Sequence, residues 1–514
     1  ENNINQTVAS GVNNASSGVA FTLPALFILG QQDPTIANFE VLPILLSALA
    51  GSFLGIVFII PLRKQMIELE RLRFPSGIAV ATLLKSPGAG ARQAKLLLGG
   101  FALATAFHVL VELGWLPQEI DLGAPLGIPA YIPIAVGVSF ASIGAGLLSG
   151  VGGLPFVFGA LLAWWVISPV AVGMGWVPTP ADVGLAAGGD AYEQFITWDV
   201  GYFGMLRPMG IGILIGGALS GVIASFPAIR AALKGLSMAS KAGGGGDEMS
   251  SKVLYTGVAL AFVVLFLAAL LSSPDVGAGR AVLIAIVGTF WLALAGLIVA
   301  QATGMTDISP ISGMSLIGVT LMFFLSGGNV VASIILGVAV SIGIGQCADM
   351  MSDLKAGHLI GALPKRQQLA QFSVAWIGVP VAVGVLYLLW GPEGGGFGPG
   401  NPELSAPQGS ALAAIIESLQ AGAAPLDKYV SGAGIGLALG IYPIGGLGVL
   451  VGLAMYLPLY ITITYGLGCV ANMALGRKMG LRWMGTTLVP VAAGFIIGEA
   501  LTSLTAVLIR LAVG

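Results

Sequence analysis

Long apolar runs separated by short charged connections are the feature that most constrains this chain. Of its 514 residues, 56% are apolar and only 9% are charged. Runs such as Lys252–Ser272 have roughly 20 residues, the length that an α-helix needs to cross about 30 Å of hydrocarbon. A water-soluble protein would carry far more charge. The sequence therefore predicts a protein surrounded mostly by lipid.

Apolar runs of this length predict an all-α polytopic membrane protein. A transmembrane β-barrel would show alternating segments of about ten residues. The 78 glycines suit helices that pack closely in lipid, where small residues let backbones approach. We expect about 12–14 transmembrane segments, counted on helix length. The clearest runs are residues 41–61, 95–116, 252–272, 281–300, 370–390 and 483–510.

The distribution of charge predicts how the chain crosses the membrane. Lys and Arg concentrate in connections 63–92, 230–252, 355–366 and 477–482. Acidic connections alternate with them, at 112–121, 182–199, around Asp275 and at 393–403. Basic loops favour the cytoplasm. We therefore expect a multi-pass protein of the bacterial inner (plasma) membrane with its basic loops cytoplasmic.

A glycine-rich linker, residues 237–251, divides the chain almost in half. Residues 1–236 and 252–514 are the expected transmembrane halves. Each half has a Gln followed by a Ser/Thr/Gly-rich stretch, at Gln6–Gly18 and Gln301–Gly313. We interpret this as two parallel pseudo-repeats. Coincidence in an Ala/Gly/Leu-rich sequence is the alternative.

Two polar stretches interrupt the apolar pattern, at Asn2–Ser17 and Thr303–Ser315. Polar backbone inside hydrocarbon is costly unless protein or a wet cavity surrounds it. Paired breaks in two repeats therefore predict broken or re-entrant helices that line a transport site, and a pair of interfacial loops is the alternative. The candidate substrate-binding residues are Gln6, Thr7, Asn13, Ser16, Ser17, Arg207, Thr306, Asp307, Ser312 and Gln408.

Isolated charges within apolar runs must be paired or hydrated. Glu499 lies in the middle of a predicted helix and is the first candidate for proton coupling, although a static hydrogen bond would also explain it. Arg207 needs a carboxylate such as Asp199, an anionic substrate or the membrane interface. Asp349 is the second proton-coupling candidate. Glu417, after a Pro-Gln-Gly sequence, is the third.

Two further groups are candidates for gating. Asp353 lies one turn after Asp349, and Lys355 follows it, so local ion pairing is the alternative. The second group begins an apolar helix with a proline at its first turn and a serine as its cap. Its members are Phe74, Pro75, Ser76 and Gly77, and an ordinary helix start is the alternative.

Several chemistries find no support in the sequence. There is no Walker A motif for ATP-driven pumping and no HExxH motif for a metalloprotease. Cys347 and Cys469 are interpreted as small buried hydrophobes, and His108 and His358 as structural residues. We expect no cofactor, no bound metal, no catalytic residue and no nucleic-acid partner.

Seven stretches resemble the oligopeptide transporter (OPT) family, including its prokaryotic members and the plant yellow-stripe-like metal-chelate transporters. The FPSG sequence and the Asp353–Gln368 stretch are the more specific matches. One departure is GQCADMMSDLK, where relatives commonly have Gly-Asp-(Thr/Ser) before Asp-Leu-Lys; residues 180–200 match nothing in the family pattern. The stretches are Glu1–Gly18, Pro61–Leu84, Ile311–Leu316, Asp353–Gln368, Leu404–Glu417, Tyr456–Ile461 and Ala492–Leu501.

The resemblance implies a proton-coupled carrier that takes up small peptides or peptide-like metal chelates. It also implies a duplicated helical architecture in which Glu1 belongs to about the third helix. We expect a secondary active transporter whose partners are a small peptide or peptide-like substrate, protons and membrane lipid. A homo-oligomer is left open. The rival interpretations are a metal-chelate transporter, a passive channel and a structural membrane subunit.

Overall fold

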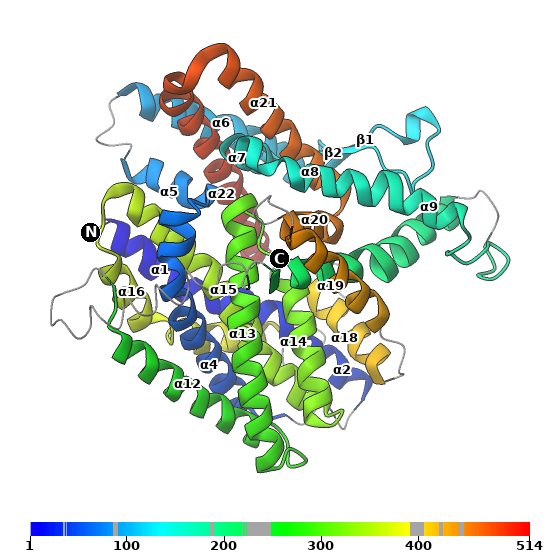
Figure 1. Ribbon diagram of the computed structural model, residues 1–514, viewed down its shortest axis with the longest axis vertical. Helices are drawn as coiled ribbons and strands as arrows, with labels where there is room; N and C mark the ends of the chain where they lie inside the picture. The colour runs from blue at the N-terminus through cyan, green and yellow to red at the C-terminus, as the bar shows by residue number, and fades with distance from the viewer. Residues whose placement is uncertain are drawn as a thin grey trace. The chain divides into compact units, whose positions relative to one another are not determined.

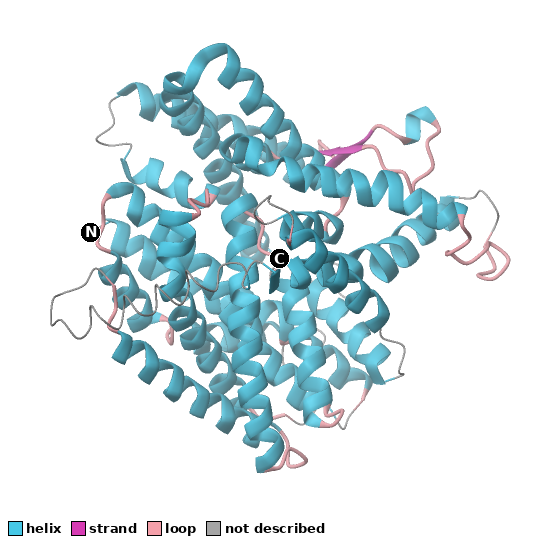
Figure 2. Cartoon of the chain, in the orientation of Figure 1, coloured by secondary structure: helices cyan, strands magenta, loops and turns pink. Residues whose placement is uncertain are grey.

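The computed structural model describes residues 2–33, 36, 39–85, 91–185, 190–217, 219–220, 223, 248–390, 406–420, 425–441 and 447–513. Nearly all described elements are helices, and one pair of short strands is the only sheet among them (Figure 2). The predicted all-α class is confirmed.

Ten helical segments in the described residues are long and apolar enough to span a membrane. A further span forms if α16 and α17, which are bent by 42° relative to each other, are taken together. The sequence predicts a higher number, about 12–14, and the shorter apolar helix Gly313–Ser326 accounts for part of the difference. The length and composition of these segments are those of a multi-pass membrane protein.

The chain folds into two compact units. Unit 1 comprises residues 1–71, 225–303 and 309–424, and unit 2 comprises residues 72–224, 304–308 and 425–514. Each unit draws on both sequence halves, and the internal duplication of those halves stays a prediction. Residues 237–247 of the predicted linker lie outside the described residues.

Unit 1 is built around α15, whose residues are buried along almost its whole length. α15 packs against α1, α4 and α14. A Cβ added at Gly51 of α4 would lie 2.1 Å from the carbonyl oxygen of Ala339, so this close approach requires glycine. The elements are α1 (Asn2–Thr22), α2 (Pro24–Gln32), α4 (Val41–Ile59), η1 (Ile60–Leu62), η2 (Lys64–Leu69), α12 (Ser251–Ser272), α13 (Ala278–Thr306, in this unit as far as Thr303), α14 (Ile311–Ser326), α15 (Val330–Ile360), α16 (Pro364–Val374), α17 (Gly378–Trp390) and α18 (Pro407–Gln420).

Unit 2 pairs α6 with α22 and α7 with α21 (Figure 1). Strand β1 runs antiparallel to β2, with Glu119 opposite Gly137 and Asp121 opposite Ala135. The elements are α5 (Pro75–Lys85), α6 (Ala91–Glu112), β1 (Glu119–Asp121), η3 (Ala124–Leu126), β2 (Ala135–Gly137), α7 (Phe140–Ser149), η4 (Gly150–Gly153), α8 (Leu154–Leu161), η5 (Leu162–Ile167), α9 (Ser168–Gly173), α10 (Asp190–Phe195), η6 (Ile196–Leu206), α19 (Leu426–Gly440), α20 (Leu447–Tyr456), α21 (Leu459–Trp483), η7 (Met484–Leu488) and α22 (Val489–Val513).

The two predicted helix breaks have different outcomes. The break within Thr303–Ser315 is confirmed, because α13 ends at Thr306 and α14 begins at Ile311. The prediction of a break within Asn2–Ser17 is wrong, since α1 is a continuous helix from Asn2 to Thr22. The hydroxyls of Ser16 and Ser17 donate to backbone carbonyls three residues earlier, which is compatible with helix.

Candidate functional site

Two carboxylates lie one helical turn apart on α15, the most buried of the spans. Asp349 and Asp353 share one face of this helix, as the spacing predicts, and they interact electrostatically. Asp353 is only 4% exposed. Ionisable groups buried in a membrane span are usually functional, because burying them unpaired is costly.

Side chains of α1 and α16 surround Asp353. Gln6 of α1 donates from Nε2 to Asp353 Oδ1 at 2.5 Å. Gln367 of α16 donates from Nε2 to the Asp353 carbonyl oxygen at 2.9 Å and to Thr7 Oγ1 at 3.0 Å. The Thr7 hydroxyl in turn donates to the carbonyl oxygen of Asn3 at 3.0 Å. The structure thus brings the predicted residues Gln6, Thr7 and Asp353 together.

A second amide pair links α1 to Asp349. The side-chain amide of Asn14 contacts the side-chain amide of Gln346. In the amide orientation that satisfies both of its ends, Asn14 donates to Asp349 Oδ2 at 2.9 Å and accepts from the Gln346 N–H at 2.5 Å. Both carboxylates of α15 therefore face amide side chains.

This cluster contains buried polar atoms that no other described group satisfies. They are both polar atoms of Asn3 and Gln371, Oε1 of Gln6 and Gln367, Nε2 of Gln346, and Oδ2 of Asp353. Buried polar groups in proteins are normally hydrogen-bonded, so such a concentration of exceptions makes this cluster the candidate site. We refer to Asn3, Gln6, Thr7, Asn14, Gln346, Asp349, Asp353, Gln367 and Gln371 as the α1–α15–α16 cluster.

Other predicted residues of α1 lie away from this cluster. Asn13 and Ser16 are exposed, and Ser17 is half-buried. Their hydroxyl and amide groups interact with one another and with the helix backbone. One face of α1 therefore enters the polar cluster, and the other does not.

In unit 2 the structure joins a predicted gating residue to a predicted substrate-binding residue. The Asp307 carboxylate accepts from the Ser76 backbone N–H at 2.8 Å and from the Ser76 hydroxyl at 2.6 Å. Asp307 thereby caps the N-terminus of α5, the role that the sequence assigned to Ser76 itself. The start of a helix favours a negatively charged group, and here that group is the protein's own carboxylate.

The residues around this cap adopt an uncommon backbone conformation. Phe74 and Asp307 have backbone φ values of 48° and 70°, which residues other than glycine rarely adopt. Phe74 is fully buried, and its N–H donates to the carbonyl oxygen of Gly304 at 2.8 Å. Pro75 is the first residue of α5, and Gly77 is buried in its first turn. Strain held at such points is typical of functional segments.

Glu499 lies within α22, and its carboxylate reaches the start of α7. Its Oε1 accepts from the Ser139 hydroxyl at 2.8 Å, and its Oε2 accepts from the Ala141 N–H at 2.9 Å. These bonds place the carboxylate at the N-terminus of α7, whose positive end favours it. This geometry is the static hydrogen bond that the sequence left open beside a proton-coupling role.

The remaining candidates do not gather at one place. The Arg207 guanidinium lies 5.6 Å from the centre of the Phe203 ring and interacts electrostatically with Tyr429. Gln408 is half-buried on α18, and Glu417 is exposed on the same helix. Lys355 on α15 and Thr306 at the end of α13 are buried. The side chain of Ser312 lies outside the described residues.

Sequence reasoning missed the amides of α16. Gln367 and Gln371 are one turn apart and fully buried, on a helix that begins at the end of the basic connection 355–366. The spacing of these glutamines was the available signal. Within the described residues, no group of three or more His, Cys, Asp or Glu side chains could hold a metal ion.

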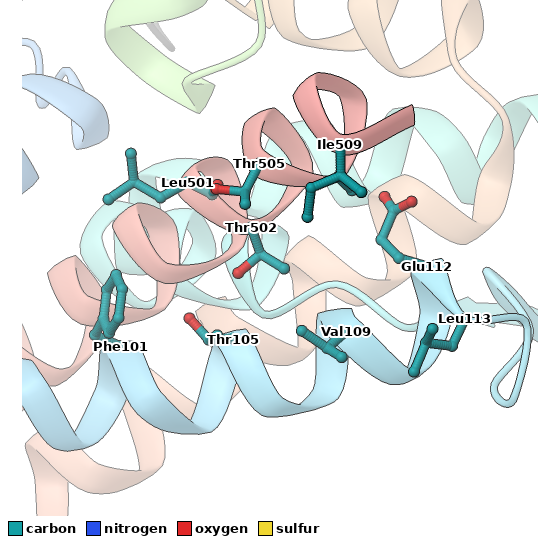
Figure 3. A pocket seen from close by; sticks show the side chains of 10 residues that line it. Phe101, Thr105, Val109, Glu112, Leu113, Leu501, Thr502, Thr505 and Ile509 are labelled. Atoms are coloured by element: carbon teal, nitrogen blue, oxygen red, sulfur yellow. The ribbon is translucent and has the colours of Figure 1, made fainter. Parts of the chain in front are cut away.

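An apolar cavity of about 440 Å³ lies between α6 and α22 and does not include any predicted site residue (Figure 3). Its threonine hydroxyls donate to backbone carbonyls, as Thr502 does to Gly498, so they present little polarity to the cavity. Few residues of α6 are buried. A cavity of this character is suited to hydrocarbon.

The spans, the broken helix and the buried ionisable groups define the class as a polytopic membrane protein with a polar interior. The chain belongs to the OPT oligopeptide transporter family, whose model matches residues 1–510. This confirms the resemblance drawn from the sequence motifs. The family consists of transporters, which are not enzymes.

Individual relatives agree with the family. A Haemophilus influenzae protein named as an oligopeptide transporter is 28% identical over 480 residues, covering 85% of this chain and 73% of the relative. A Saccharomyces cerevisiae protein with a similar name is 22% identical, covering 71% of this chain and 65% of the relative. The Arabidopsis thaliana metal-nicotianamine transporter YSL2 is 28% identical over 157 residues, covering 28% of this chain and 24% of the relative.

Proposed function

We propose that this protein is a proton-coupled carrier that imports small oligopeptides or peptide-like compounds across the bacterial inner membrane. The observation that carries the proposal is the α1–α15–α16 cluster, where Asp349 and Asp353 lie among buried amides. Amide side chains both donate and accept hydrogen bonds, so they suit the peptide groups of a substrate. The family and the names of the relatives support transport of such compounds.

The pair of carboxylates supplies a reason for coupling to protons. Two negative charges one turn apart in a buried helix repel each other strongly, because the surroundings screen them poorly. A proton held by Asp349 or Asp353 removes that repulsion, and its release restores it. Occupation of the cluster by substrate and by a proton would thus depend on each other, which is what symport requires.

Glu499 ranks below this pair as a proton carrier in the proposal. Both of its oxygens accept hydrogen bonds at the start of α7, and protonation would weaken them. Glu417 ranks lower still, because it is exposed on α18. The motif at Phe74 and Ser76, fastened by Asp307, is retained as the proposed gate.

Metal-chelate uptake is the second candidate, and the similarity to the Arabidopsis metal-nicotianamine transporter favours it. A chelated ion brings its own ligands, so the same amide-rich cluster could bind it. Thermal stabilisation of the purified protein by a panel of tripeptides and a panel of amino-acid metal chelates distinguishes the two. The panel that raises the unfolding temperature identifies the substrate class.

Uptake by proteoliposomes tests the proposal. An imposed pH gradient should drive accumulation of a radiolabelled tripeptide above its external concentration, and an uncoupler should abolish that accumulation. Asp349→Asn and Asp353→Asn should lose accumulation, and Asp275→Asn, an exposed carboxylate in unit 1, should retain it. Equilibration without accumulation would instead indicate a passive channel, and absence of uptake a structural subunit.

A further inference from the structure

A second cavity, which is polar and has a volume of about 150 Å³, lies in unit 2 beneath the β1–β2 connection. The side chains that matter for its chemistry are Glu119, Asp121, Trp164, Trp198, Gln194 and Tyr460. None of them belongs to the α1–α15–α16 cluster or to the cap of α5. The acidic connection that contains Glu119 and Asp121 is predicted from the charge pattern to lie outside the cell.

The acidic side of the cavity carries negative charge without a neighbouring cation. Glu119 and Asp121 are two residues apart on β1, so they point to the same face of the strand. Among the described residues, no Lys, Arg or His nitrogen lies within 4 Å of either carboxylate. Asp121 Oδ1 accepts from the N–H of Gly123 at 2.7 Å, which fixes it in the connection, and Glu119 interacts with Asp121 and Tyr460 by charge alone.

The other side of the cavity is aromatic. The rings of Trp164 and Trp198 have centroids 5.9 Å apart, and Tyr202 packs against both. The Trp164 indole N–H donates to the carbonyl oxygen of Leu457 at 3.2 Å, so this ring is held in place by its polar edge. Aromatic faces attract cations, and the exposed carboxylates of Glu119 and Asp121 lie on the opposite side of the cavity.

The backbone that presents these aromatic rings is π-helical. Trp164 lies in the π-helix η5 and Trp198 in the π-helix η6. π-helical turns are rare and occur frequently at functional sites, since they cost stability relative to α-helix. Two π-helical segments therefore contribute to the wall of this cavity.

Size limits what can enter. Complete small-molecule ligands usually occupy pockets of about 300–1,000 Å³, whereas this cavity has about 150 Å³. A single ammonium group with a few attached carbons fits this space. A divalent metal ion would need about six oxygen ligands, and the cavity offers two carboxylates.

We propose that this cavity binds the ammonium group of a small organic amine, with Glu119 and Asp121 supplying opposite charge and Trp198, held in place against the buried Trp164, supplying an aromatic surface. This identification of the ligand rests on the proposed function: the ammonium group is the free amino terminus of a peptide-like substrate. The cavity thus selects substrates that carry a primary amine.

Binding to the purified protein in detergent tests the site without transport. Tryptophan fluorescence and calorimetry follow titration with n-propylammonium chloride and with triglycine, and the matched neutral ligands are n-propanol and N-acetyltriglycine. Both amines should bind at least tenfold more tightly than their neutral counterparts. Raising the ionic strength from 0.05 to 0.5 M, which shortens the screening length severalfold, should weaken amine binding further.

Variants assign the binding to this cavity. Glu119→Gln and Asp121→Asn should each weaken n-propylammonium binding about fivefold, and the amide oxygen in Asp121→Asn can still accept from Gly123. Trp198→Phe should remove most of the fluorescence change. Asp182→Asn removes an exposed carboxylate outside the cavity and should leave the affinity unchanged.

Three results would overturn the proposal: equal binding of the neutral ligands, unchanged affinity in both carboxylate variants, or calcium chloride binding more tightly than either amine. Its failure is separable from failure of the transport proposal. Equal uptake of triglycine and N-acetyltriglycine would remove the cavity's role and leave peptide transport intact. Amine binding without any peptide uptake would support the cavity and contradict the transport proposal.

Discussion

At the residue scale, the acidic side chains that interrupt apolar runs fall into two groups. Asp307 and Glu499 each accept a backbone N–H at the start of a helix. Asp349 and Asp353 face amide side chains in the C-terminal half of a buried helix. The sequence identifies all four as unusual charges, because each interrupts an apolar run. It cannot separate the groups, since the helix starts that Asp307 and Glu499 cap are more than 200 residues away in the chain.

The capping group has a measurable role in stability. Asp307→Ala removes both acceptors of Ser76, and loss of a helix cap costs about 0.5–2 kcal/mol. We expect a lower unfolding temperature in detergent, with Asp307→Asn intermediate because its amide oxygen can still accept one bond. Asp182→Ala, in an exposed turn, is the control. An unfolding temperature equal to that of the unchanged protein would show that the cap contributes nothing.

Replacing Glu499 distinguishes capping from proton transfer. In Glu499→Gln the amide oxygen can accept from Ala141, so the start of α7 is retained. We expect uptake within about twofold of the unchanged protein, with the same pH dependence, because the proposed carriers are Asp349 and Asp353. Loss of pH dependence in this variant alone would return Glu499 to first place.

The pH dependence of amine binding follows from Glu119. Burial and the charge of Asp121 raise the pKa of Glu119 above its usual value, and Tyr460 also faces this carboxylate. Ammonium binding requires the ionised carboxylate, so affinity should be full above this raised pKa and fall as the pH drops through it. Titrations between pH 4 and 8 measure the midpoint, which should shift to lower pH in Asp121→Asn.

At the scale of elements, helix type could be predicted better than helix continuity. The break between α13 and α14 follows from Asp307 and Pro310, which interrupt an apolar run. The polar stretch of α1 looks similar in sequence but stays helical, because Gln6 and Asn14 find partners on α15. The glutamines of α16 could not be assigned to the interior, since burial of a polar helix depends on what packs against it.

Adjacent glycines of α6 provide a matched test of helix packing. A Cβ at Gly100 would lie 2.5 Å from the carbonyl oxygen of Val491 on α22, whereas one at Gly99 would meet nothing within 4 Å. Gly100→Ala should destabilise the protein by about 1–3 kcal/mol through overpacking. Gly99→Ala should stabilise it by about 0.5–1 kcal/mol, because alanine favours helix. Thermal unfolding of the two variants compares them, and equal shifts would contradict the close contact.

At the scale of the whole molecule, the apolar runs predict a multi-pass helical membrane protein, and the family match agrees. The division into compact units was not predictable from the linker, because each unit takes segments from both halves of the chain. Long-range packing decides that division, and it leaves no local pattern in the sequence. Loop orientation, internal duplication and proton coupling remain predictions of the charge pattern and the resemblance.

The most direct test is tripeptide uptake by proteoliposomes under an imposed inward proton gradient, comparing the unchanged protein with Asp349→Asn, Asp353→Asn and the control Asp275→Asn. The account predicts uncoupler-sensitive accumulation by the unchanged protein and the control, and at most passive equilibration in the two α15 variants. Accumulation that persists in both variants with its pH dependence intact would contradict it.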